Sequence, residues 1–284
     1  MPIDYDKLLA LKIPDAEHTY TDRDTMLYAL GVGVGHDPLD LKQLDFVYEK
    51  NLKALPTFAA VLGYPGFWVR DLDTGIDWLK LVNGEQGVML HQPVKPSGTV
   101  LGQSRIVEVV DKGAGKGALV YTERKVTAKA SGALIATVTQ TTFCRADGGF
   151  GGPRESPPVH QIPERSPDLV CDLGTRPEQA MIYRLSADRN PLHVDPEVAK
   201  AAGFDRPIFH GLGTFGVVGH ALLKSLCDYD PARVRSFAGR FSSPVFPGET
   251  IRTEFWRDGD VVSFRASVPD RGVVVMNNGR AEVT

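Results

Sequence analysis

Apolar and polar residues alternate along two stretches of the chain in the manner of β-strands. In each stretch, several runs with this period are separated by short segments rich in glycine, proline and other turn-forming residues. Such runs, bounded by turn residues, predict antiparallel strands. The sequence therefore predicts one meander with strands at residues 88–91, 99–110, 118–130 and 133–143, and a second with strands at residues 236–246, 249–257, 261–268 and 272–283.

Three other apolar stretches have the features of helices. Residues 21–31 begin with Thr21 as an N-cap and end at Gly31. Residues 55–63 begin with a Leu-Pro pair, and Pro56 is tolerated in a first helical turn. Residues 208–223 are apolar and begin with several glycines. Residues 32–44, which contain glycines and an Asp-Pro pair, are predicted to form a loop.

The sequence contains an internal repeat. Residues 26–30 correspond to 181–185, residues 57–63 to 214–219, and residues 93–98 to 244–248, at offsets of 155, 157 and 151. Three matches in the same order indicate a duplication. Each half then combines a helix with an antiparallel meander, which predicts an α+β fold in which a sheet wraps round a central helix. The copies differ at two positions, since Gly33 aligns with Asp188 and Ala54 aligns with Gly211.

Residues 146–168 are the clearest break in composition. Their density of glycine and proline cannot continue a strand or a helix. We predict a first half at residues 1–145, a linker at 146–168 and a second half at 169–284. The Gly-Gly-Phe-Gly-Gly run in the linker is not predicted to bind phosphate, because it lacks the Lys-Ser/Thr pair and a following helix.

Composition narrows the class of protein. The 284 residues are 42% hydrophobic and 24% charged with a net charge of −3, so the charge gives no reason to expect a nucleic acid partner. The three cysteines are dispersed, which favours reduced thiols. No apolar run approaches the ~20 residues of a membrane span. The first residues do not resemble a signal peptide, and the last do not resemble a peroxisomal address. The expectation is a soluble cytoplasmic protein without a membrane partner.

The candidate chemistry lies in residues 183–196. Asp188 and His193 are five positions apart, and Pro191 stiffens the backbone between them. A carboxylate and an imidazole on one rigid turn can hold a water molecule and exchange its proton. Downstream, Gly211 at the start of the apolar helix can offer a free N–H to an oxyanion, because it has no side chain and the helix dipole favours negative charge there.

The segment Tyr183-Arg-Leu-Ser-Ala-Asp-Arg-Asn-Pro-Leu-His193 resembles the hydratase 2 motif of the MaoC-like, (R)-specific enoyl-CoA hydratases. The resemblance covers nearly the whole chain. Within the family, the chain is most similar to the hydratase 2 unit of peroxisomal multifunctional enzymes of type 2. It implies a double hot-dog fold and pairing into homodimers. It makes Asp188 and His193 catalytic, Asn190 their support, and Gly211 the backbone donor to the thioester oxygen.

The same resemblance implies substrate contacts outside this motif. Contacts to coenzyme A and the acyl group fall at Asn83, Gly84, Lys112 and Phe241, and a functional acid falls at Glu49. The residue before Gly84 departs from the pattern, since relatives usually have histidine where this chain has Asn83. Read without the resemblance, Lys112 is a solvated turn lysine and Glu49 a surface charge.

The expected reaction is reversible addition of water to a trans-2-enoyl-CoA, giving the (3R)-3-hydroxyacyl-CoA, without a metal or redox cofactor. The first half, which lacks the dyad, is expected to bind medium, long or bulky acyl tails beside residues 31–44 and 55–63. The alternatives are a dehydratase of acyl-carrier-protein thioesters, a hot-dog thioesterase and a non-catalytic acyl-CoA binding protein. A metal site at His193, Asp195 and His210 is disfavoured by their spacing. A purely structural Asx turn with a buried histidine is the remaining reading.

Overall fold

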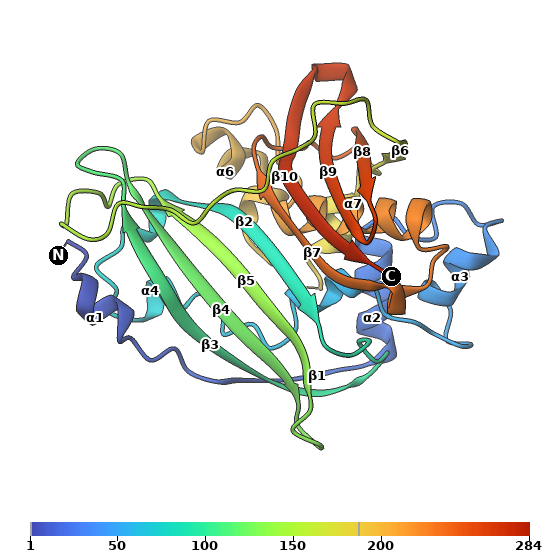
Figure 1. Ribbon diagram of the computed structural model, residues 1–284, viewed down its shortest axis with the longest axis horizontal. Coiled ribbons are helices and arrows are strands. Elements are labelled where there is room, and N and C mark those ends of the chain that lie inside the picture. The colour runs from blue at the N-terminus through green and yellow to red at the C-terminus, as the bar shows by residue number, and fades with distance from the viewer. Residues whose placement is uncertain (1, 187) are drawn as a thin grey trace.

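A computed structural model describes residues 2–186 and 188–284, so Ala187 of the hydratase-like motif lies outside the described residues. The strands form one antiparallel ten-stranded sheet in the order β1-β3-β4-β5-β2-β7-β10-β9-β8-β6 (Figure 1). The first half contributes β1 Ala16–Tyr20, β2 Leu81–Leu90, β3 Gly98–Asp111, β4 Ala118–Ala128 and β5 Leu134–Cys144. The second half contributes β6 Leu169–Gly174, β7 Val234–Phe241, β8 Thr250–Asp258, β9 Val261–Val268 and β10 Val273–Val283.

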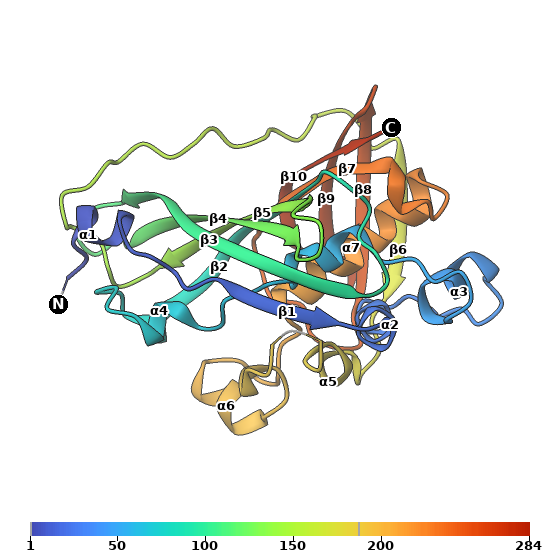
Figure 2. The same cartoon turned by 90° about the horizontal axis from the view of Figure 1, so that it is seen from below.

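The helices lie mainly on one side of this sheet, as Figure 2 shows for α4, α5 and α6. The α-helices are α1 Tyr5–Leu9, α2 Asp22–Gly31, α3 Leu41–Val47, α4 Trp68–Asp71, α5 Gln179–Tyr183, α6 Pro196–Ala201 and α7 Gly211–Leu226. The 3-10 helices are η1 Pro56–Ala60, η2 Trp78–Lys80, η3 Pro191–His193, η4 Pro231–Arg233 and η5 Pro269–Arg271. Among the described residues, no helix is both long enough and apolar enough to cross a membrane.

The strand order shows the duplication directly. Strands β1 to β5 of the first half correspond, in chain order, to β6 to β10 of the second. With this correspondence the order of the sheet is the same when read from either edge. The two halves meet at the antiparallel pair β2–β7, where Gly87 lies opposite Ala238. The sequence predicted two sheets; the structure instead joins them edge to edge across this β2–β7 seam, because pairing there removes two exposed strand edges.

The eight strands of the predicted meanders are present, but the strand expected at residues 88–91 is the longer β2, Leu81–Leu90, and two further strands were missed. β1 and β6 form the two outer edges of the sheet, and in the described part of the chain β1 pairs with β3 alone and β6 with β8 alone. The predicted helix at residues 21–31 is also confirmed, since Thr21 and Asp24 form a capping box. The predicted loop at residues 32–44 is partly wrong, because α3 begins at Leu41 with Asp40 as its N-cap.

The two central helices differ in length. α7 is a 16-residue helix that is mostly buried, as predicted. Its counterpart in the first half is only the short 3-10 helix η1. Gly63, with φ of 62°, and the proline at position 65 stop the chain from continuing as an α-helix. All five residues of η1 are buried, so the groove expected beside residues 55–63 is filled by η1 itself.

The chain between Cys144 and Leu169 contains no helix or strand and crosses the face of the sheet opposite to the helices (Figure 2). It is fixed at several points. The buried carboxylate of Asp111 accepts hydrogen bonds from the N–H groups of Gly149 and Gly151 at 2.7 and 2.8 Å. Further along, Trp256 Nε1 donates to the carbonyl of Arg165 at 2.6 Å. The segment therefore joins the two halves across the outer face of the sheet.

Candidate active site

Two successive turns position the carboxylate of Asp188. Its Oδ1 accepts a hydrogen bond from the N–H of Asn190 at 2.9 Å. Asn190 in turn caps η3, because its side-chain oxygen accepts from the N–H of Leu192 at 3.0 Å. Pro191 occupies the first position of η3, where its fixed φ is compatible with the helical turn. The Asn-Pro pair thus sets the course of the chain between the acid and the histidine.

His193 ends η3 and faces the acid. Its Nδ1 lies 2.9 Å from the carbonyl oxygen of Ile208. Because a carbonyl can only accept, Nδ1 carries the proton, and in the neutral ring Nε2 has a free lone pair. That Nε2 lies 3.7 Å from Oδ2 of Asp188. This separation is too long for a direct hydrogen bond and leaves both atoms free to bind one water molecule between them.

The two members of this pair differ in exposure. The side chain of His193 is 8% exposed and that of Asp188 is 49% exposed. Burial lowers the pKa of His193, although the hydrogen bond to Ile208 and the charge of Asp188 oppose the effect. The imidazole is therefore neutral near pH 7 and able to accept a proton.

A second histidine, His210, completes the cluster. Its ring stacks on His193 with centroids 3.7 Å apart, and its Nε2 lies 3.0 Å from the backbone carbonyl oxygen of Asp188. Burial and the neighbouring His193 lower the pKa of His210 to about 3. Sequence reasoning considered His210 only as a metal ligand. Its position directly before Gly211 was the available signal for a role in the site.

Gly211 begins α7 beside this cluster. The first hydrogen bond of the helix runs from the N–H of Thr214 to the carbonyl of His210, so the N–H of Gly211 is one of the free donors at the helix N-terminus. A methyl group built on Gly211 would lie 3.6 Å from the ring of Phe241, an ordinary contact. Phe241 therefore lies beside Gly211, in contact distance of the side on which a Cβ would project.

The predicted substrate contacts at Asn83, Gly84 and Phe241 come together next to this amide. The register of β2 shifts at Asn83, and beyond the shift Glu85 pairs with Arg240 of β7. Gly84 and Phe241 are the next residues of the two strands and so lie at the same end of the β2–β7 seam. Oδ1 of Asn83 is buried without a hydrogen-bond partner among the described residues. Phe241 thus lies beside Gly211, and Gly84 and Asn83 follow at the same end of the seam.

Lys112 and Glu49 lie elsewhere. Lys112 is exposed in the loop between β3 and β4, with its Nζ 3.5 Å from the hydroxyl of Ser156. Glu49 is exposed in the turn after α3, and both views place α3 away from α6 (Figures 1 and 2). No ion pair joins Glu49 to another described residue. Their predicted roles gain no support from this placement.

The cluster of Asp188, His193 and His210 has the residue types of a metal site, with one potential ligand atom of each within 4.8 Å of the others. Each imidazole donates to a backbone carbonyl, which leaves a free lone pair on Nε2 of His193 and on Nδ1 of His210. Asp195, the third residue of the alternative considered from sequence, caps α6 instead.

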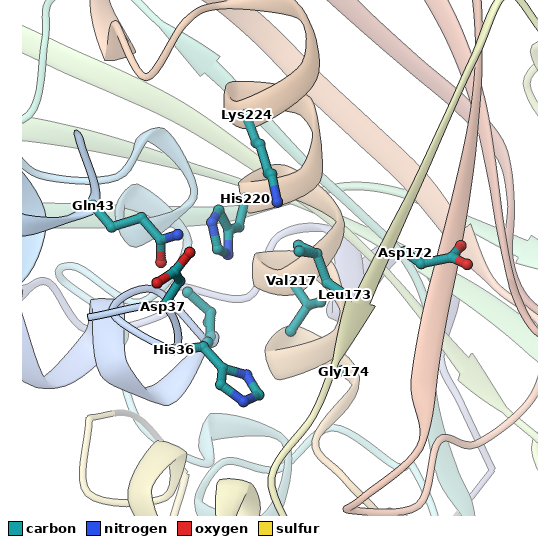
Figure 3. Close-up of a pocket in the computed structure, with 11 residues that line it drawn as sticks. His36, Asp37, Gln43, Asp172, Leu173, Gly174, Val217, His220 and Lys224 are labelled. Atoms are coloured by element: carbon teal, nitrogen blue, oxygen red, sulfur yellow. The ribbon is translucent and has the colours of Figure 1, made fainter. Parts of the chain in front are cut away.

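A separate cavity of about 220 Å³ lies between the first-half loop and the middle of α7 (Figure 3). It is lined by Val32, Gly33, His36, Asp37, Gln43, Asp172, Leu173, Gly174, Val217, His220 and Lys224. Figure 3 shows His36, Asp37 and Gln43 on one side and His220 and Lys224 on the other, while the carboxylate of Asp172 points away. Gly33, the counterpart of Asp188, is in its wall. A lining this polar is poorly suited to the acyl tail that the sequence assigned to this loop.

Comparison with known proteins identifies both halves. Residues 18–146 match the family described as MFE-2 hydratase 2 N-terminal domain, and residues 158–278 match the family described as MaoC like domain. The chain is 38% identical to a protein of Arabidopsis thaliana named "Enoyl-CoA hydratase 2, peroxisomal", over 95% of this chain and 93% of the relative. It is 36% identical to the peroxisomal multifunctional enzyme type 2 of Mus musculus, over 96% of this chain and 37% of that protein.

Solved structures agree with the fold predicted from sequence. The MaoC-like dehydratase of Phytophthora capsici superposes with a TM-score of 0.85 at 36% identity, covering 98% of each chain. A protein of Mycobacterium tuberculosis described as a double hotdog fold superposes with a TM-score of 0.56 at 13% identity, over 99% of this chain and 98% of that one, a likeness of fold alone. The predicted α+β double hot-dog fold is confirmed.

These comparisons correct the predicted location. The relatives from Arabidopsis thaliana, Mus musculus and Neurospora crassa are named peroxisomal, so the cytoplasmic prediction is wrong. It rested on dispersed cysteines, the lack of an apolar span and the chain ends. Dispersed thiols and the lack of a span are shared by soluble proteins of several compartments and do not discriminate between them.

Proposed function

The chain belongs to the MaoC-like, enoyl-CoA hydratase 2 family, and on this premise we propose that Asp188, Asn190, His193 and Gly211 form the active site of an (R)-specific enoyl-CoA hydratase of β-oxidation. The reaction is the reversible addition of water to a trans-2-enoyl-CoA. The observation that carries the assignment of residues is the 3.7 Å separation of Asp188 Oδ2 and His193 Nε2 beside the N-terminus of α7.

In this site a water molecule bridges Oδ2 of Asp188 and Nε2 of His193. The base is Nε2 of His193, because Nδ1 already donates to the carbonyl of Ile208. Nε2 takes a proton from the water while the water oxygen forms a bond to C3 of the enoyl group. Negative charge moves through C2 to the thioester oxygen, which accepts a hydrogen bond from the N–H of Gly211. A proton delivered from the dyad to C2 completes the addition. Water addition is redox-neutral, so the reaction calls for no redox cofactor, and in this proposal the dyad and the N–H of Gly211 supply the proton transfer and charge stabilisation without a metal.

Asn83, Gly84 and Phe241 flank the thioester in this proposal. Their support is that the β2–β7 seam gathers them beside Gly211. Lys112 and Glu49 are retained as coenzyme A or acyl contacts on the resemblance alone. Asn190 acts by holding the Asp188 turn, through the hydrogen bond from its N–H and through its cap on η3.

The acyl tail is proposed to run along the first half, past residues 64–78. Tyr64, Phe67 and Trp78 in this segment are 45%, 38% and 40% exposed, and the last two rings meet edge to face at 5.8 Å. Burial raises the pKa of Tyr64, and the charge of Asp188 is a further cause of the rise, so Tyr64 lies within electrostatic reach of the dyad. In this proposal the exposed aromatic surface, which begins at Tyr64, receives medium or long chains.

This path is tested by Phe67→Lys. Losing a buried aromatic contact with the tail costs about 1.5–3 kcal/mol, so kcat/KM for trans-2-decenoyl-CoA should fall roughly 10–100-fold while that for crotonyl-CoA changes little. Leu39→Lys is the matched control, since Leu39 is 86% exposed on the loop before α3. Equal losses on both substrates would mean that the tail lies elsewhere.

The reaction itself is tested by incubating the protein with crotonyl-CoA and trans-2-decenoyl-CoA. We expect loss of the enoyl absorbance, a (3R) product, and the same rate after treatment with a chelator. Release of free coenzyme A would indicate a thioesterase instead. A (3S) product, or activity that returns only with added metal, would contradict the proposal.

A homodimer is part of the same proposal, because the family resemblance implies it. Sedimentation of the protein at micromolar concentration should give twice the mass of one 30.9 kDa chain. A single species of one chain would refute this part without affecting the reaction.

A further inference from the structure

His210 and His193 connect two segments that are distant in sequence through a reciprocal pair of hydrogen bonds. His193, on the motif turn, donates from Nδ1 to the carbonyl of Ile208, on the segment that leads into α7. His210, on that second segment, donates from Nε2 back to the carbonyl of Asp188 on the turn. The two rings stack between these bonds at an interplanar angle of 29°. We call this arrangement of His193 and His210 the histidine clasp.

The protonation of the clasp follows from its partners. Both carbonyls can only accept, so each ring carries its proton on the nitrogen that faces a carbonyl. His210 is 2% exposed and is surrounded by the rings of His193, Tyr183 and Phe209. Two stacked imidazoles cannot both be charged in such a place without a large cost. His193 faces the carboxylate of Asp188, whereas burial and the neighbouring His193 lower the pKa of His210 to about 3, so His210 is the neutral member and His193 is free to gain and lose a proton.

The clasp also connects the two parts of the proposed reaction. Asp188 is otherwise held by a local bond to Asn190, two residues away. Gly211 directly follows His210, whose backbone carbonyl accepts the first hydrogen bond of α7. The bond from His210 to Asp188 thus fixes the acid relative to the N–H of Gly211.

We propose that His210 is a positioning residue that ties the Asp188 turn to the N-terminus of α7, so that the water on the dyad and the thioester oxygen on Gly211 are held at a fixed separation. This inference rests on the proposed function for its kinetic part. Water must attack C3 while the charge develops on the thioester oxygen of the same substrate. Displacements of about 1 Å between such groups can cost roughly 100-fold in rate.

Two substitutions separate the features of His210. His210→Phe keeps an aromatic ring for stacking but removes the donor to Asp188. His210→Gln removes the ring but keeps an N–H donor near the position of Nε2. For crotonyl-CoA, we expect kcat of the Phe variant to fall about 10–100-fold with KM within about threefold. The Gln variant should recover most of that loss.

Stability and binding controls identify a merely structural role. The Kd of butyryl-CoA, a saturated analogue, should stay near the wild-type value in both variants, since it does not report the position of the attacking water. The melting temperature should fall at least as far in the Gln variant, which loses the ring stacked on His193, as in the Phe variant, so a recovery of kcat in the Gln variant does not come from stability. Wild-type kcat in the Phe variant would overturn the proposal. An equal fall of kcat in both variants would also overturn it, because packing alone would then explain the effect.

A third measurement does not depend on activity. In NMR spectra of the whole protein, the Nε2 proton of His210 should exchange slowly with solvent and remain visible from pH 5 to pH 8. Rapid exchange of that proton would show that the clasp does not form. If the clasp proton is present and the wild-type protein hydrates no enoyl-CoA, the proposed function fails while the clasp stands as a structural element without this role.

Discussion

The Asp188–His193 pair shows how residue chemistry depends on local backbone geometry. The two side chains face each other, but they differ in exposure. Asp188 is half in solvent, whereas His193 is buried against His210. Burial lowers the pKa of the His193 imidazole. The hydrogen bond from its Nδ1 to Ile208 leaves the Nε2 lone pair free. These properties suit a group that must accept a proton from water at neutral pH.

At this scale the first prediction concerns the dyad. Asp188→Asn and His193→Gln should each lower kcat for crotonyl-CoA by roughly 100-fold or more, because each removes one partner of the attacking water. Asp195→Asn is a matched control, since Asp195 accepts hydrogen bonds from the first turn of α6 and lies two residues from His193. It should leave kcat near the wild-type value. Near-normal rates in both dyad variants would make the pair structural.

A second residue-scale prediction concerns pH and stability. Burial lowers the pKa of His220 from 6.5 to about 4. The unfolded chain then binds a proton that the folded chain does not, so the free energy of unfolding should decrease as pH falls from about 6.5 to about 4. His220→Gln should reduce this slope by up to about 1.4 kcal/mol per pH unit. Urea unfolding of the wild type and the variant at pH 4.5, 5.5 and 6.5 measures how the free energy of unfolding depends on pH.

The control for that slope is His91→Gln, because His91 is exposed and stays in contact with water in both states. An unchanged slope in the His220 variant would show that another group dominates the acid sensitivity. The side chain of His220 also contacts the hydroxyl of Tyr229 at 3.0 Å, a bond that glutamine can retain.

The sequence could predict the dyad because both residues lie on one short turn, where spacing and proline determine the geometry. It could not predict the part played by His210, which depends on ring stacking between segments 17 residues apart. The gathering of Asn83 and Phe241 near Gly211 came from the family resemblance, because it depends on the register of β2 against β7. Read from its surroundings alone, Glu49 is a surface charge, which agrees with its exposure in the structure, and only the resemblance gave it a functional role.

At the scale of elements, α7 owes its position to glycines on the side that faces the first half. A methyl group built on Gly216 would overlap Val32, and one on Gly219 would lie 2.5 Å from Cγ2 of Thr57 in η1. These glycines let the helix approach the first half closely. Gly211, on the same helix, has room for a methyl group.

The third prediction follows from this difference. Gly219→Ala should lower the free energy of unfolding by about 1–3 kcal/mol through overpacking, despite the better helix propensity of alanine. Gly211→Ala should change it by less than about 1 kcal/mol. Urea unfolding of both variants, compared at the same temperature, is the measurement. Equal stability of the two would mean that α7 can shift to accept the methyl group.

Elements with a strong local signal were predictable, and those that depend on their neighbours were not. The eight central strands are long β-rich runs bounded by turn residues, and the helix at residues 22–31 is capped by its own sequence. β1 and β6 are only five and six residues long, which leaves too few positions for a clear alternation in the sequence. The predicted helix at residues 55–63 became the short η1, because the Gly63 and proline signals that end it outweigh the apolar pattern before them.

At the scale of the whole molecule, the two halves are held by contacts that do not depend on the linker. Five residue pairs join β2 to β7, and Tyr28 of α2 meets Tyr183 of α5 with ring centroids 5.9 Å apart. α7 also packs on η1 through Gly219. The linker adds fixed points on the outer face of the sheet but no strand.

The fourth prediction is that the chain tolerates a break in the linker. Residues 153–158 are exposed, so a protease site placed there should be cut without unfolding. The two fragments should elute together in size-exclusion chromatography and retain most of the hydratase activity. Fragments that separate under native conditions would show that the linker, rather than the seam, holds the halves together.

The β2–β7 seam also imposes an order on biosynthesis. The partner of β2 is encoded about 150 residues after it, so at roughly 5–20 residues per second the edge of β2 leaves the ribosome about 8–30 seconds before β7. During that interval the first half presents an open strand edge with glycine at its centre. Because β2 and β7 are counterparts, the β2 edge of another nascent chain is the most similar substitute partner. Slow translation or crowded polysomes should therefore favour wrongly paired first halves, and a chaperone that covers this edge should raise the yield of active enzyme.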